Sequence, residues 1–177
     1  MTKLRIGLDL DDTVNYWFSE YLKIFGIPKN ELEITKNVRK LRTNKQFWEN
    51  LPILHRPDFI PTLYCTKRTS SKKYIVNFLN KNSLPKAPIY QMFYQNGNKA
   101  SVIKGKVDVF IDDSLFNFIT MNLSGVPCLL MDGPHNRSWL GPGRVYDLSY
   151  NHILDVFKPF KEEVFPDFKK IVNAYKQ

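Results

Sequence analysis

The sequence contains little cysteine and no long apolar run. Its two cysteines, Cys65 and Cys128, are too few for a framework of disulfide bonds, so a reducing compartment is favoured. No stretch approaches the roughly 18 apolar residues that are needed to cross a bilayer. Acidic residues also interrupt the first segment, residues 1–12, before an apolar signal-peptide core can form. We therefore expect a soluble protein of the cytoplasm.

Two kinds of catalytic motif are missing as well. The three histidines, His55, His135 and His152, do not have the spacing of metal ligands. A cysteine-dependent phosphatase loop would need an arginine six positions after Cys65, but that position is Ser71. These absences argue against a histidine-based metal motif and against a cysteine nucleophile.

No run of five or more basic residues is present, although the chain is basic overall. Lys and Arg number 26 against 17 Asp and Glu, which gives a net charge of +9 and a pI of about 9.5. This balance suits anionic partners such as nucleotides, nucleic acid or other phosphates. Because the lysines are spread along the whole chain, solubility alone is the other interpretation.

What the chain does contain is typical of one globular domain. Of its 177 residues, 43% are hydrophobic and 14% are aromatic, which is enough for a substantial core. Strands are expected at 4–10, 62–66, 88–93, 107–111 and 126–131, and helices at 14–25, within 30–51, at 70–82, 98–104 and 114–123, and from 150 onward. A Gly/Pro-rich loop at 132–143 separates the last of these strands from the segment 144–148. The strands are continuous apolar runs, which are typical of a parallel sheet with helices on both faces.

The stretch between the first two expected strands is too long for a single crossover. It spans roughly 45 residues, whereas connections in compact domains are usually far shorter. We therefore expect an α/β, Rossmann-like core formed by residues 1–14 and 58–177, with a small helical cap formed by residues 15–57.

Polar residues follow the apolar strands where each strand ends. They are Asp9, Asp11 and Asp12 after the first strand, Thr66, Lys67 and Arg68 after the second, Lys99 at the start of a helix, and Asp112 and Asp113 after the fourth. Ligands of open α/β sheets bind beyond these strand ends. Like charges about 4 Å apart repel by about 4 kcal/mol at an effective dielectric constant of 20, so the carboxylates need a cation. Oxygen ligands favour Mg²⁺, while Lys99 and Thr66 suit an anionic substrate.

These residues resemble the four motifs of the haloacid dehalogenase (HAD) superfamily of phosphatases. Asp9-Leu10-Asp11-Asp12-Thr13 matches its DxDx[T/V] signature, and Thr66, Lys99 and Asp112-Asp113 match its second, third and fourth motifs. Within the superfamily, the chain resembles the 5′(3′)-deoxyribonucleotidases and their bacterial and phage relatives. The features of that subgroup are the insertion after the first motif, the aromatic pair Phe47-Trp48 and the loop at 132–137.

The resemblance implies a catalytic role for each carboxylate. Asp9 is the expected nucleophile, and Asp11 is the expected general acid and then general base. Mg²⁺ is expected on the Asp9 carboxylate, the Asp11 main-chain carbonyl and one acid of the Asp112-Asp113 pair. Asp112 is favoured as the direct ligand because it follows the strand directly, and Asp113 is then expected next to the ligands without binding the ion itself.

The resemblance also implies how the phosphate is held. Thr66 is expected to hydrogen-bond a phosphoryl oxygen, and Lys99 to neutralise the nucleophile and the phosphate. Lys104 is the alternative for this lysine, because it lies closer to the fourth strand. Lys67 and Arg68 depart from the motif of the eukaryotic relatives, and either reach the phosphate or substrate or lie in solvent.

Four further residues are candidates for substrate binding. Trp17, Phe47 and Trp48 stack on a base or pack within the cap. Arg137 contacts the substrate or holds its own loop through a structural ion pair.

The sequence therefore predicts a Mg²⁺-dependent 5′(3′)-nucleotidase that acts through an aspartyl-phosphate, either as a monomer or as a homodimer. Two alternatives stay open: a 3′-phosphatase of nucleic-acid ends and a general small-metabolite phosphatase. A receiver-like signalling domain fits less well, because receivers carry adjacent acids at the first strand and an acceptor Asp on a middle strand. Here Asp9 and Asp11 alternate, and the third strand ends in 93–95 without an acid.

Overall fold

The computed structural model describes residues 3–92 and 97–175, and its central feature is a six-stranded sheet. The strands are β1 (Ile6–Leu8), β2 (Leu63–Thr66), β3 (Ile89–Gln91), β4 (Val109–Asp112), β5 (Cys128–Met131) and β6 (Arg144–Val145). All neighbouring strands pair in parallel, in the order β3-β2-β1-β4-β5-β6. The predicted α/β fold with a parallel sheet is confirmed.

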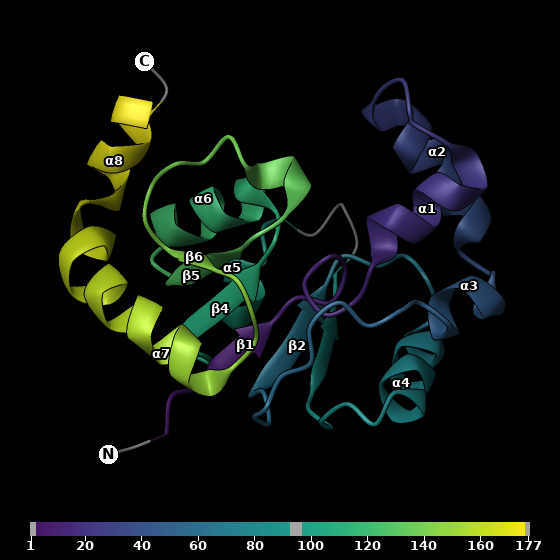
Figure 1. Ribbon diagram of the computed structural model, residues 1–177, viewed down its shortest axis with the longest axis horizontal. Helices are drawn as coiled ribbons and strands as arrows, with labels where there is room; N and C mark the ends of the chain where they lie inside the picture. Colours follow the sequence, from purple (N-terminus) through teal and green to yellow (C-terminus); the bar gives the residue numbers. More distant parts are fainter. Residues whose placement is uncertain (1–2, 93–96, 176–177) are drawn as a thin grey trace.

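Helices connect and cover the strands (Figure 1). They are α1 (Trp17–Phe25), α2 (Glu31–Leu41), α3 (Lys45–Glu49), α4 (Lys72–Lys81), α5 (Ala100–Ile103), α6 (Leu115–Leu123), α7 (Tyr150–Pro159) and α8 (Phe168–Tyr175), with short helical turns at Pro134–Asn136, Phe160–Val164 and Phe165–Asp167. The chain winds outward from β1 in both directions, so right-handed crossovers place α4 and α6 on opposite faces of the sheet. No helix among the described residues is long and apolar enough to span a membrane.

The side of the sheet on which the chain adds strands changes between β1 and β4, and this change positions the site. From β1 the chain proceeds to β2 and β3 on one side, whereas β4, β5 and β6 lie on the other. Such a switch point opens a crevice at the carboxyl ends of the two central strands. Asp9 follows β1 and Asp112 ends β4, and the register Leu8↔Ile111 places these two acids side by side.

The segment between β1 and β2, where the sequence predicts a cap, contains α1, α2 and α3. Figure 1 shows these helices together on one side of the molecule, next to α4 and away from α7 and α8. An aromatic cluster on α1 runs from Trp17 through Tyr21 to Phe25, with ring centroids 5.6 and 5.2 Å apart. Aromatic rings at helical spacing bury large areas, which lets so short a segment pack.

Several element boundaries differ from the sequence-based prediction. The first strand is shorter than residues 4–10, because the chain leaves the sheet at Asp9 and turns back at Asp12, which has a φ of 54°. The helix predicted from residue 14 begins only at Trp17, and the helical stretch expected within 30–51 is divided into α2 and α3. The short strand β6 has no counterpart among the predicted strands, and the C-terminal helix is interrupted after Pro159. The predicted end of the third strand, Phe93, lies outside the described residues.

Candidate active site

Lys99 lies between two carboxylates at the centre of the site. Its Nζ is 2.7 Å from Asp9 Oδ1 and donates a hydrogen bond to Asp112 Oδ2 at 2.6 Å. The lysine side chain is 1% exposed. Lys104, the alternative from the sequence, instead donates to the Ser124 carbonyl at the surface. The structure therefore places Lys99 in the site and leaves Lys104 outside it.

The Lys99 ammonium contacts an aromatic ring that packs closely against the neighbouring strand. The Lys99 ammonium lies 5.3 Å from the centre of the Phe110 ring on β4. That ring packs across Gly7 of β1, where a Cβ would stand only 2.7 Å from Phe110 Cδ2. Any side chain at position 7 would displace this ring, so the glycine leaves space for the Phe110 ring that contacts the lysine.

Burial and the neighbouring charges oppose each other at Lys99 and at Asp9. Burial lowers the pKa of Lys99, but the carboxylates of Asp112 and Asp9 outweigh it and hold the pKa above its ordinary value. Burial raises the pKa of Asp9 well above its usual range, the Lys99 ammonium opposes this, and the charges of Asp112 and Asp113 add to it. The site thus holds more negative charge than one lysine neutralises.

The two acids of the fourth motif face different surroundings. Asp112 is fully buried, and its carboxylate accepts from Lys99, from Asn117 Nδ2 at 3.0 and 3.1 Å, and from the Ser114 N–H at 3.0 Å. All of these donors come from the protein itself. They leave the Asp112 carboxylate little capacity for a further ligand.

Asp113, in contrast, lines the pocket. The Oδ2 atom of Asp113 lies 2.7 Å from His135 Nε2, and its Oδ1 atom accepts a hydrogen bond from Thr13 Oγ1 at 3.3 Å. Burial raises the pKa of Asp113, and the hydrogen bond from His135 opposes the shift. The same hydrogen bond raises the pKa of His135. This geometry favours Asp113 over Asp112 as the acid that meets a bound ligand, which is the reverse of the preference from the sequence.

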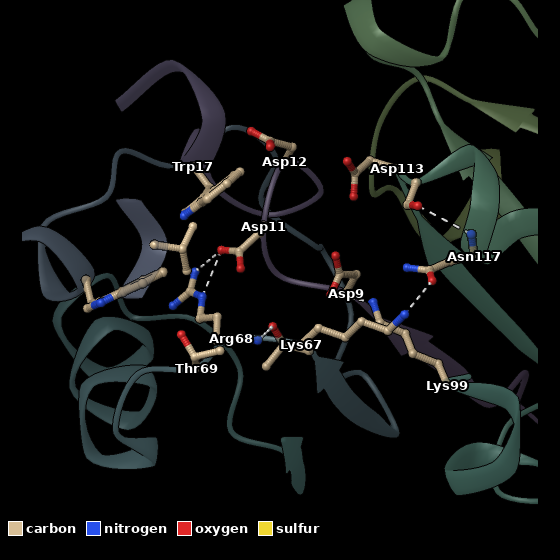
Figure 2. A pocket seen from close by; sticks show the side chains of 14 residues that line it. Asp9, Asp11, Asp12, Trp17, Lys67, Arg68, Thr69, Lys99, Asp113 and Asn117 are labelled. Atoms are coloured by element: carbon tan, nitrogen blue, oxygen red, sulfur yellow. Dashed lines mark hydrogen bonds and ion pairs between the residues drawn. The ribbon is translucent and has the colours of Figure 1, made fainter. Parts of the chain in front are cut away.

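Carboxylate oxygens of Asp9, Asp112 and Asp113 lie within 4.8 Å of one another. A cavity of about 300 Å³ opens beside them. Its lining residues are Asp9, Asp11, Asp12, Trp17, Val38, Trp48, Thr66, Lys67, Arg68, Thr69, Lys99, Asp113, Ser114 and Asn117, several of which are labelled in Figure 2. Residues from α1, α2 and α3 therefore share this pocket with the strand ends.

The residues after β2 point in different directions (Figure 2). Thr66 is buried beside the cavity. Lys67 Nζ donates to Asn117 Oδ1 at 3.2 Å, on the side of Asp113. Arg68 pairs with Asp11 Oδ1 on the opposite side, at 2.8 Å from Nε and 2.6 Å from Nη2. Lys67 therefore faces the open pocket, whereas Arg68 is engaged by Asp11.

The aromatic candidates separate in the same way. Trp17 lines the cavity, and Trp48 lines it while remaining 1% exposed. Phe47 lies in another hollow with Glu20 and Ile24, so its predicted contact with a base is not supported. Adjacent residues of a short helix point about 100° apart, which separates Phe47 from Trp48.

Arg137 also lies away from the cavity. It lines a separate hollow with Asp132 and Tyr146 at the β6 edge of the sheet. The ion pair that holds this loop comes instead from Arg144, whose Nη1 is 2.8 Å from Asp132 Oδ1. The structure thus places Arg137 outside the cavity that contains Asp9, and among the described residues it forms no ion pair.

Sequence reasoning missed Asn117 and gave Asp12 no role. Asn117 contacts both Asp112 and Lys67, and so connects two of the predicted motifs. Ser114 is the N-cap of α6, and its Oγ accepts a hydrogen bond from the backbone N–H of Asn117 at 3.3 Å, which places Asn117 in the first helical turn. Asp12 lines the cavity, and burial together with Asp113 raises its pKa to about 7.

The fold has a counterpart among solved structures. No protein-family model matches the sequence, and the comparison with curated proteins gives no match. A HAD-superfamily hydrolase of subfamily IA, variant 1, from Geobacter sulfurreducens PCA is similar in structure, with a TM-score of 0.52. The two share 14% sequence identity over 87% of this chain and 99% of that chain. The chain has a HAD-type fold. At 14% identity, this likeness concerns the fold alone.

Proposed function

We propose that this protein is a Mg²⁺-dependent phosphomonoesterase whose best substrate is a nucleoside monophosphate. The observation that carries the proposal is the placement of Asp9 beside Lys99 and Asp113, with Asp11 across the same cavity. A carboxylate next to a fixed cation, with a second carboxylate across the cavity, is the arrangement that nucleophilic phosphoryl transfer needs.

The acid cluster fits a hard divalent cation. Its oxygens lie close together, and one lysine leaves an excess of negative charge that a cation would neutralise. Asp9 and Asp113 supply the side chains that face the cavity, and the Asp11 carbonyl is the third expected ligand. When bound, Mg²⁺ would neutralise charge on the phosphoryl oxygens and orient the phosphate.

The residues of this chain then carry the two steps of hydrolysis. Asp9 attacks phosphorus, so that a bond forms from its oxygen to phosphorus while the ester P–O bond breaks. The leaving oxygen keeps the electron pair of that bond and takes a proton from Asp11. Asp11 then removes a proton from water, whose oxygen bonds to phosphorus while the bond from Asp9 to phosphorus breaks. The electron pair of that bond returns to the Asp9 carboxylate, and phosphate is released. Lys99 holds Asp9 in place, and Thr66 and Lys67 offer donors to the phosphoryl oxygens.

The proposed substrate class follows from the size and lining of the cavity. About 300 Å³ is at the lower end of the range for small-molecule sites, which suits one nucleotide. Trp17 supplies an aromatic wall near Asp11 (Figure 2). The net charge of +9 also favours a second candidate, a phosphatase that acts on the 3′ end of a nucleic acid.

A substrate panel tests the proposal. We expect Mg²⁺-dependent phosphate release from 5′- and 3′-nucleoside monophosphates at least tenfold faster, by kcat/KM, than from sugar phosphates. A 3′-phosphorylated oligonucleotide as the better substrate, with activity falling steeply as salt rises, would favour the second candidate, because phosphate contacts release counterions. Equal turnover of all small phosphomonoesters would indicate a general phosphatase. No release from any of them would remove the proposed function.

Binding of Mg²⁺ should depend on pH and on Asp113. Because burial raises the pKa of Asp9 and of Asp113, protons must leave these acids before the cation binds. We therefore expect tighter binding at pH 8 than at pH 6 by isothermal titration calorimetry. Asp113→Asn should weaken binding about tenfold or more, whereas Asp132→Asn, outside the cavity, should not. Full binding by Asp113→Asn, with loss in Asp112→Asn, would restore the preference for Asp112.

A further inference from the structure

Arg68 is a buried charge between two aromatic rings. It is 2% exposed, and its guanidinium carbon lies 5.2 Å from the centre of the Trp48 ring and 5.5 Å from that of Phe78. The first ring comes from α3 and the second from α4. A guanidinium stacks well on aromatic faces, but a buried charge also requires an ionic partner. The two rings therefore orient the guanidinium plane, and its N–H groups remain available to bind an acidic partner.

The partner is Asp11, and the contact is one-sided. Nε and Nη2 of Arg68 both approach Oδ1 of Asp11, at 2.8 and 2.6 Å. Among the described residues, no donor contacts the other oxygen, Oδ2. Figure 2 shows the Asp11 carboxylate between Arg68 and Asp9. One oxygen of Asp11 is thus anchored, and the other is left for the substrate.

The backbone of Arg68 is also held in place. Its N–H donates to Thr66 Oγ1 at 3.2 Å, and its carbonyl accepts from Gln91 Nε2 at 2.8 Å. Gln91 belongs to β3 and also donates to the Ser70 carbonyl. The arginine therefore extends from a loop that two strands fix, and it does not have the freedom of a side chain that follows a substrate.

We propose that Arg68 is a positioning residue for Asp11, and not a ligand of the substrate phosphate. By holding Oδ1, it presents Oδ2 as the oxygen that gives its proton to the leaving oxygen as the ester P–O bond breaks. Lys67, one residue earlier, contacts Asn117 on the other side and keeps its proposed role as a hydrogen-bond donor to the substrate phosphate. This inference rests on the proposed phosphatase function.

The test compares substrates whose leaving groups differ in their need for a proton. Arg68→Met removes the donors but keeps an unbranched apolar chain between the two rings, and the Asp11 side chain that loses its partner is 22% exposed, so solvent can still reach its charge. We expect its kcat/KM to fall about 100-fold for a nucleoside monophosphate, whose alkoxide must be protonated. For p-nitrophenyl phosphate, a good leaving group, the fall should be less than tenfold. Because kcat/KM reports steps up to phosphoenzyme formation, hydrolysis of the intermediate does not obscure the comparison.

Two further variants separate positioning from other roles. Lys67→Gln, the matched control, should lower kcat/KM equally for both substrates, because both carry the same phosphate. Arg68→Met added to Asp11→Asn should cause no further loss, because the residue it positions is already inactive. Thermal unfolding confirms that each variant is folded, and Arg68→Lys, which keeps the charge, provides a second variant with an intermediate loss.

Three outcomes would overturn the inference. Equal losses on both substrates with a raised KM would make Arg68 a substrate ligand. Full additivity with Asp11→Asn would show that Arg68 and Asp11 act separately. Wild-type activity in both Arg68→Met and Arg68→Lys would show that the reaction does not depend on the Arg68 side chain. Wild-type protein without activity on either substrate would instead remove the proposed function, and the inference with it.

Discussion

Asp9→Asn should abolish phosphate release while the protein stays folded. The amide cannot form the aspartyl-phosphate, so we expect kcat to fall by at least about 10³-fold, as is common when a nucleophile is removed. The same change removes one of three clustered buried carboxylates. Because burial and the neighbouring acids raise the pKa of Asp9, its charge is unfavourable there without a metal. The melting temperature of the metal-free variant should therefore equal or exceed that of the wild type.

The two readouts together test the assignment of Asp9. Phosphate release is measured on the best nucleotide of the panel, and thermal unfolding is followed without divalent cations. Asp155→Asn, an exposed carboxylate on α7, is the control and should change neither. An Asp9→Asn protein that keeps its turnover is not compatible with Asp9 as the nucleophile. An inactive variant that also fails to fold would leave the loss of turnover attributable to unfolding.

The part of the site that the sequence predicts well is the part that lies at strand ends. Asp9 and Asp112 each follow a short apolar run, and parallel strands bring their carboxyl ends to one edge. Local pattern and general topology are sufficient for this placement. The α/β fold and the position of the acids therefore follow from the sequence alone.

The direction of each side chain is harder to predict. Asp112 and Asp113 are neighbours at the end of β4, where successive side chains point to opposite faces. Only the surrounding helices decide which face is the pocket, and α6 encloses Asp112 with Asn117 while Asp113 remains open. A preference based on order along the chain thus selected the enclosed acid.

Arg68 and Phe47 show the same limit over longer distances. The partners of Arg68 come from α3, α4 and the loop after β1, and no spacing in the sequence encodes that meeting. Phe47 and Trp48 are equivalent as a pair, and tertiary packing alone turns Trp48 inward. Residues that act through contacts between distant segments are therefore the ones that pattern analysis misassigns.

Lys99→Met should produce the largest loss of stability at the site. The methionine leaves Asp9 and Asp112 buried without their cation, and breaking a buried ion pair from one side costs about 3–5 kcal/mol. At about 2–4 °C per kcal/mol for a chain of this size, the melting temperature should fall by roughly 6–20 °C. Lys104→Met, at the opposite end of the same short helix, should shift the melting temperature little, because Lys104 only reaches a surface carbonyl.

Removal of the negative charge should reverse part of this loss. In the Lys99→Met, Asp9→Asn double variant, one of the two uncompensated charges is gone, so its melting temperature should lie above that of Lys99→Met alone. Mg²⁺ should also raise the melting temperature of Lys99→Met more than that of the wild type, since the cation compensates the same acids. If the double variant and Mg²⁺ both leave the loss unchanged, then contacts of Lys99 other than its two ion pairs, such as that of its ammonium with the Phe110 ring, stabilise the site.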